Sequence, residues 1–138
     1  ICSASSKDMN AVAAIYSIEA QSGVTGWEKI APNAIEMDHH RVRLQDDGFP
    51  YFVALLDTNV IGFTYASNYR ARFGYQFTLE SSIYIAQKFQ RLGIGRFLMT
   101  KLIDRCSELG LRQMLAIIGY STNKMSIEFH LKMGFKKI

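Results

Sequence analysis

The sequence predicts an α/β domain in which a mixed sheet carries helices on its faces. Two observations lead to this fold class. Segments with the two-residue period of strands alternate along the chain with segments that have the period of helices. The chain has 138 residues, of which 49% are hydrophobic, which suits one packed core. We therefore expect a single domain over residues 1–138.

The N-terminal part reads as a short strand followed by two helices. Ser5 and Asp8 have the spacing of a capping box and predict the start of a helix that ends near Ala20. Asn33 is a favourable N-cap for a second helix that ends near Leu44.

The middle of the chain reads as an antiparallel meander. Strands are predicted over residues 51–56 and 60–66, around a hairpin turn at residues 57–59. Residues 73–85 predict a longer strand because two sets of side chains alternate along it. A turn containing glycines follows at residues 90–95.

The C-terminal part predicts a helix, a strand, a shorter helix and a last strand. The first helix follows from apolar residues at helical spacing, among them Leu98, Leu102 and Cys106, and Gly110 is expected to close it. The remaining elements are expected as a buried strand, a helix ended by Gly134 and a strand, over residues 113–118, 126–133 and 135–138.

Charge and composition exclude several classes of partner. Sixteen basic and twelve acidic residues give a net charge of +4, and the basic residues are spread along the chain. This pattern argues against a nucleic-acid partner and is compatible with an anionic small molecule. No apolar run has transmembrane length, no signal-peptide layout is found, and two cysteines do not suggest a disulfide framework. We expect a cytoplasmic protein with no membrane partner.

The turn Gln90-Arg91-Leu92-Gly93-Ile94-Gly95 has the features of an anion site. Glycine lets the backbone approach a ligand, and the first N–H groups of the following helix lack intrahelical acceptors. Arg91 and Arg96 would add positive charge. A plain strand-to-helix turn is the alternative. A Walker A loop is excluded because its pattern is missing, and the dinucleotide fingerprint is excluded because Leu98 stands where its third glycine belongs.

These residues resemble the GNAT superfamily of acetyl-CoA-dependent N-acetyltransferases. Gln90, Gly93 and Gly95 fill its Q/R-x-x-G-x-G/A loop. Asn123, Ser126 and the ending Met133-Gly134-Phe135 resemble its second CoA-binding segment. The resemblance implies a mixed, mostly antiparallel sheet, acetyl-CoA as co-substrate and no metal. By family analogy it also implies a homodimer.

Within the superfamily, the phosphinothricin and methionine sulfone or sulfoximine acetyltransferases are the most similar group. The similarity rests on the strand Tyr75–Tyr84, on the loop QRLGIG, and on Ala116–Gly119 followed by Asn123, Ser126 and His130. Members of this group continue past Gly-Phe into a further strand pair, which residues 1–138 do not include. The resemblance implies cofactor contacts at Ile83, Tyr84, Ile85, Gln90, Arg91, Gly93, Ile94, Gly95, Arg96, Asn123 and Ser126.

Glu80 and His130 are the candidate catalytic residues. Glu80 lies in a strand among apolar and hydroxyl residues, where burial would raise the pKa of a carboxyl group and make it a base for the acceptor amine. A solvent-facing strand glutamate is the alternative. The resemblance places His130 where many GNAT enzymes have the tyrosine that protonates the thiolate. It leaves open whether His130 acts as acid, as base or as an orienting group.

The resemblance assigns the acceptor site to Arg72, Tyr75 and Phe77. An arginine fork suits a carboxylate or phosphinate group. The expected activity is acetyl transfer to the primary amine of a small amino acid-like molecule. The rivals are a polyamine, an aminoglycoside or a protein N-terminus as acceptor, and a CoA-binding module without turnover. Arg72 argues against a polycation, and the presence of both Glu80 and His130 argues against a pure sensor.

A metal site is not expected. His39 and His40 are adjacent on a predicted helix, so their side chains diverge, and no Cys or carboxylate spacing completes a zinc site.

Overall fold

The structure is a computed structural model that describes residues 1–21, 32–69, 78–118 and 124–137. In this part of the chain, five strands form one sheet in the order of the sequence. They are β1 (Cys2–Ser3), β2 (Tyr51–Leu56), β3 (Asn59–Asn68), β4 (Thr78–Ile85) and β5 (Gln113–Ala116). Neighbouring strands are antiparallel except for β4 and β5, which are parallel. The expected mixed, mostly antiparallel sheet is confirmed.

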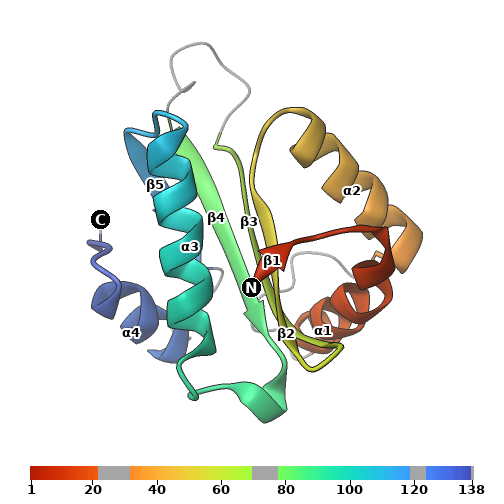
Figure 1. Cartoon of the computed structure of the whole chain (residues 1–138). Coiled ribbons are helices and arrows are strands. Elements are labelled where there is room, and N and C mark those ends of the chain that lie inside the picture. Colours follow the sequence, from red (N-terminus) through yellow and green to blue (C-terminus); the bar gives the residue numbers. More distant parts are fainter. Residues whose placement is uncertain (22–31, 70–77, 119–123, 138) are drawn as a thin grey trace.

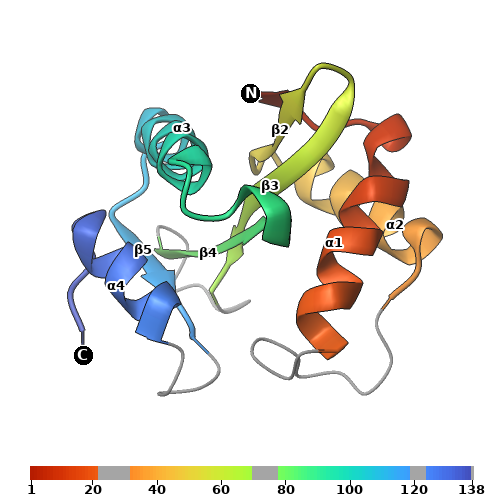
Figure 2. The same ribbon diagram turned by 90° about the horizontal axis from the view of Figure 1, so that it is seen from below.

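Helices cover both faces of the sheet (Figures 1 and 2). The helices α1 (Met9–Gln21) and α2 (Ala34–Asp46) lie on one face, and α3 (Ile94–Glu108) and α4 (Lys124–Lys132) lie on the other. Two short 3₁₀ turns, η1 (Ser6–Asp8) and η3 (Gln87–Phe89), precede α1 and α3. Each face has its own apolar core, so the sheet separates the α1–α2 layer from the α3–α4 layer.

The helix boundaries follow from the caps that the sequence predicts. The Ser5 amide donates a hydrogen bond to the Asp8 carboxylate at 2.9 Å. At the start of α2, the Asn33 side chain accepts from the Glu36 amide at 2.9 Å. Gly110 and Gly134 follow α3 and α4 with φ angles of +92° and +101°, a region that glycine adopts without strain.

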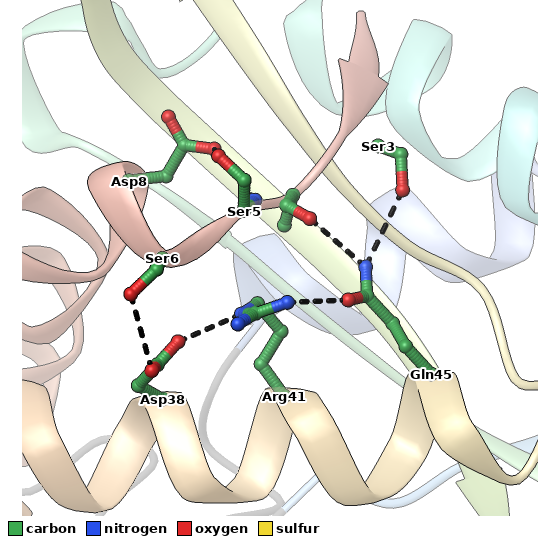
Figure 3. Close-up of polar contacts among 8 residues, drawn as sticks. Ser3, Ser5, Ser6, Asp8, Asp38, Arg41 and Gln45 are labelled. Atoms are coloured by element: carbon green, nitrogen blue, oxygen red, sulfur yellow. Dashed lines mark hydrogen bonds and ion pairs between the residues drawn. The ribbon is translucent and has the colours of Figure 1, made fainter.

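A polar network fixes the N-terminal segment to α2 (Figure 3). Arg41 donates to Asp38 at 2.8 Å and to Gln45 at 2.6 Å. Gln45 in turn donates to the backbone carbonyl of Ala4 at 3.0 Å, and Ser6 donates to Asp38 at 3.2 Å. This network joins α2 to the segment between β1 and α1.

Two sequence predictions near the C-terminus are wrong. Residues 113–118 were expected to form a buried strand, whereas β5 ends at Ala116 and is exposed at Gln113 and half-buried beyond it. The reason is its place at the edge of the described sheet, where β4 is its partner. The expected strand over residues 135–138 is also not found, because residues 135–137 have no regular secondary structure.

Candidate active site

A cavity of about 840 Å³ lies between the end of β4, the turn before α3 and the helix α4. Its volume is in the range of small-molecule sites. Of the sequence-predicted residues, those lining it are Ile83, Tyr84, Ile85, Gln90, Arg91, Gly93, Gly95, Arg96, Ser126 and His130. Ile94 does not line the cavity, because its side chain packs against the core under α3. The structure therefore gathers most of the residues that the resemblance selected.

The end of β4 offers backbone donors to the cavity. Ala86 donates to the Ile61 carbonyl at 2.9 Å. Along the antiparallel pair of β3 and β4, hydrogen-bonded and non-hydrogen-bonded residue pairs then alternate. In such a ladder the N–H groups of Ile83 and Ile85 point away from β3, toward β5. Pairing with β5 ends at Ser81 and Ala116, whereas β4 continues to Ile85. These two N–H groups therefore face the cavity side, while the N–H of Tyr84 faces β3.

The turn between η3 and α3 combines an open backbone with positive charge. Gly93 is the N-cap of α3 and has a φ of +88°, and a Cβ atom built on it would meet nothing within 4 Å. The first N–H groups of α3 extend from this point, where the helix dipole favours an anion. Arg91 and Arg96 are exposed beside it. The Gln90 side chain has a structural role as well, because it donates to the Ile85 carbonyl at 3.0 Å.

Gly95 has a different role from Gly93. A Cβ atom at Gly95 would lie 3.1 Å from Cε1 and 3.4 Å from Cζ of Phe129. The space above Gly95 is thus filled by a ring from α4. Both glycines line the cavity, and the cofactor contacts expected at them remain predictions, while Gly95 also lets helix α4 pack closely on α3.

His130 is buried in α4 and lines the same cavity. Its Nδ1 atom lies 2.8 Å from the Ser126 carbonyl oxygen. The rings of Phe129 and Phe135 contact the imidazole edge-on, with centroid distances of 5.2 Å and 5.1 Å. Because a carbonyl only accepts, Nδ1 carries a hydrogen, and in the neutral ring Nε2 keeps its lone pair.

Glu80 lies on β4, opposite Ser67 of β3 and Leu115 of β5. Its side chain is half-buried, and burial raises the pKa of its carboxyl group. Alternation along β4 places Glu80 on the same face as Tyr84, which packs against the α1–α2 core. Glu80 does not line the 840 Å³ cavity. The structure thus brings His130 to the glycine turn and leaves Glu80 on the opposite face of the strand.

Four predicted site residues lie outside the described residues: Arg72, Tyr75, Phe77 and Asn123. Conversely, the cavity includes residues that the sequence argument missed, among them Met125, Phe129 and Lys132. Their spacing along α4 puts them on the helix face that also carries Ser126 and His130. That helical spacing is the signal that could have found them.

No group of three or more His, Cys, Asp or Glu side chains in the described ranges could hold a metal ion. His40 packs edge-on against Tyr65, with ring centroids 5.1 Å apart, whereas His39 is exposed. In the same ranges, no helix is both long enough and apolar enough to cross a membrane.

Comparison with known proteins agrees with this geometry. Residues 12–135 match the model of the acetyltransferase (GNAT) family. The chain belongs to this family. It is 39% identical over 128 residues to a phosphinothricin N-acetyltransferase of Alcaligenes faecalis, and the match covers 93% of this chain and 65% of the relative. The chain thus spans about two thirds of the length of that relative.

Solved structures of GNAT proteins have the same fold. A GNAT superfamily phosphinothricin acetyltransferase from Sinorhizobium meliloti in complex with acetyl-CoA matches with a TM-score of 0.93 and 37% identity. The match covers 98% of this chain and 73% of that one. A ribosomal-protein-alanine N-acetyltransferase from Brucella melitensis matches with a TM-score of 0.95 and 27% identity, over 99% and 84% of the two chains.

Proposed function

We propose that this GNAT protein transfers the acetyl group of acetyl-CoA to the primary amine of a small amino acid-like acceptor. The observation that carries the proposal is the cavity that joins three features: the open backbone at Gly93, the part of β4 that continues beyond its pairing with β5, and the buried His130. A thioester with a pyrophosphate-bearing arm needs an anion site at one end and donors for a carbonyl oxygen at the other.

The residues of the cavity suit acetyl-CoA as co-substrate. The start of α3, with Arg91 and Arg96, would hold the pyrophosphate. The N–H groups of Ile83 and Ile85 would hold the thioester arm and stabilise the oxyanion that forms on the acetyl carbon. Ser126 lines the same cavity, and Asn123 is proposed as a further contact on the resemblance alone.

The reaction forms a C–N bond and breaks the C–S bond of the thioester. The attacking amine must lose a proton, and the departing thiolate must gain one. We assign the proton from the amine to Glu80, because burial raises the pKa of this carboxyl group toward the working pH. Since Glu80 lies on the other face of β4 from the α3–α4 layer, the acceptor would approach from the α1–α2 side, opposite the thioester.

His130 is proposed as the second proton-handling group. An ammonium acceptor has two protons to lose, and the first goes to Glu80 before the attack. The Nε2 lone pair of His130 would take the second from the nitrogen of the tetrahedral intermediate, directly or through a water, and the imidazolium so formed would protonate the departing thiolate. The net result is an N-acetyl amine, CoA thiol and one proton, which Glu80 returns to solvent, so both residues regain their starting protonation states.

The acceptor class rests on the relatives. The Alcaligenes faecalis relative is a phosphinothricin N-acetyltransferase, and the sequence resemblance adds methionine sulfone and sulfoximine. Arg72, Tyr75 and Phe77 remain the proposed acceptor contacts. A protein N-terminus is the second candidate acceptor, because the structure of the Brucella melitensis ribosomal-protein-alanine N-acetyltransferase is so similar.

The deciding experiment measures CoA release over a panel of amines. The panel contains phosphinothricin, methionine sulfone and sulfoximine, ordinary amino acids, spermidine, an aminoglycoside and a peptide with N-terminal alanine. Turnover with only the tetrahedral-headed amino acids supports the proposed acceptor. Turnover with the peptide alone supports the second candidate. Acetyl-CoA binding without turnover on any amine would refute this acceptor class and favour a CoA-binding module.

Two further proposals rest on family analogy. We propose a homodimer, which light scattering on the purified protein would test. We also propose that the protein works in the cytoplasm, where acetyl-CoA is supplied, and fractionation of cells would test this.

A further inference from the structure

The ring of Phe129 packs directly on the backbone of Gly95, across the start of α3 and the middle of α4. We infer that Gly95 and Phe129 form a packing pair that positions His130 at the cavity, so that Phe129 is a positioning residue for the reaction. The effect on the reaction rests on the proposed function, whereas the packing of Phe129 on Gly95 can be tested without turnover.

A side chain at Gly95 would crowd the ring of Phe129. A Cβ atom there would lie 3.1 Å from Cε1 of Phe129, so the ring would have to move by a few tenths of an ångström. Gly95 has no positive φ angle, so its own backbone conformation does not require glycine. Phe129 is therefore the neighbour that a side chain at this position would meet first.

The ring of Phe129 also contacts the imidazole of His130. The two rings are neighbours on α4 and meet edge-on, with planes at 88°. Phe135 also contacts the imidazole of His130, with ring planes at 82°, and the Ser126 carbonyl accepts a hydrogen bond from Nδ1. These three contacts together set the orientation of the imidazole, so a shift of the Phe129 ring would change the direction of Nε2. Small misplacements of a proton-handling group reduce catalysis strongly.

Two opposing effects decide how Gly95→Ala changes the stability. Alanine is a better helix former than glycine, so Gly95→Ala in an unobstructed helix would raise the melting temperature. Overpacking against Phe129 works in the opposite direction. Replacing Phe129 by leucine removes the ring atoms that a new Cβ atom would meet, so the gain from alanine should appear only in the Phe129→Leu background.

The experiment is a double-mutant cycle on the 138-residue protein, comparing wild type, Gly95→Ala, Phe129→Leu and the double variant. We expect Gly95→Ala to lower kcat about tenfold, with the dissociation constant of CoA little changed, and to move the pH profile of kcat. In the Phe129→Leu background the same change should cost no further activity and should raise the melting temperature. Leu131→Ala, on the exposed side of α4, serves as a control for general effects on this helix.

Two results would overturn the inference. Equal losses from Gly95→Ala in both backgrounds would mean that Phe129 is not its partner. A loss confined to CoA affinity, with unchanged kcat, would mean that Gly95 serves the co-substrate directly. If the wild-type protein shows no turnover, the proposed function fails, whereas the cycle can still be measured through the melting temperature and through the NMR shifts of the His130 ring.

Discussion

The Nδ1 atom of His130 lies 2.8 Å from the carbonyl oxygen of Ser126, one helical turn earlier on α4. This hydrogen bond occupies Nδ1 and leaves the lone pair of Nε2 available on a residue that lines the cavity. It also separates two functions of one side chain: Nδ1 fixes the ring, and Nε2 is free to exchange a proton. Variants that imitate one nitrogen at a time can therefore distinguish structure from chemistry.

His130→Asn is expected to fold like the wild type and to lose most of its acetyltransferase activity. The amide nitrogen of asparagine can donate to the Ser126 carbonyl in place of Nδ1, but asparagine has nothing in the place of Nε2. We expect kcat to fall by about 10²-fold, the lower end of the range for losing a general acid or base. The melting temperature should fall less than in His130→Ala, which loses the hydrogen bond and the ring contacts together. A kcat close to wild type in His130→Asn would remove Nε2 from the mechanism.

Glu80→Gln is expected to lower activity and raise stability at neutral pH. Burial raises the pKa of Glu80 in the folded protein, so folding favours its protonated form. The resulting stability is complete below the pKa of the unfolded chain and is lost as the pH rises through the folded-state pKa. Glutamine stays neutral, so it avoids this loss. Melting curves at pH 4 and pH 7 should show a gain for the variant only at the higher pH.

The same variant tests the base role. With no carboxylate to accept the proton of the amine, kcat should fall by about 10²–10⁴-fold, while the dissociation constant of acetyl-CoA stays near that of wild type. The acid limb of the wild-type pH profile should lie above the usual range of a glutamate and should vanish in Glu80→Gln. An unchanged profile in the variant would assign the base to another group.

Gly93 and Gly110 form a matched pair for testing the anion site. Both have positive φ angles, +88° and +92°, and a Cβ atom on either would meet nothing within 4 Å. Alanine at each position should therefore cost a similar amount of stability, about 1–2 kcal/mol, from backbone strain alone. Only Gly93→Ala should weaken CoA binding, since Gly110 follows the far end of α3. Calorimetry with CoA that shows equal affinities for both variants would place the pyrophosphate elsewhere.

The two cysteines should differ in reactivity toward a thiol reagent. Cys106 is buried in the α3 core, and burial raises the pKa of its thiol to about 11. Cys2 is exposed. We expect one thiol to react quickly in the folded protein and the second only after denaturation. Two fast-reacting thiols would contradict the burial of Cys106. Cys2→Ser should then remove the background of a CoA-release assay.

The sequence predicted best those features that depend on neighbouring residues. The capping pair at Ser5 and Asp8, the N-cap Asn33 and the glycine that ends α3 were all correct, because a cap is decided within a few positions of the chain. The exposure of β5 was not predictable in this way, since it depends on which strands lie beside it. The contact between Phe129 and Gly95 was not predictable in this way either, because the two residues lie on different helices.

Gly62→Ala should test how firmly the end of β4 is held at the cavity. Gly62 lies opposite Ile85, and a Cβ atom there would be 2.7 Å from Cδ1 of Ile85 and 3.1 Å from the backbone oxygen of Tyr84. We expect a loss of about 1–3 kcal/mol of stability from overpacking, measured by urea denaturation. CoA binding should weaken as well, because Ile85 lines the cavity. Ile85→Val removes the Cδ1 atom, so the loss caused by Gly62→Ala should shrink in that background. An equal loss in both backgrounds would assign the strain to the Tyr84 backbone, and unaltered CoA affinity would show that the end of β4 is not part of the site.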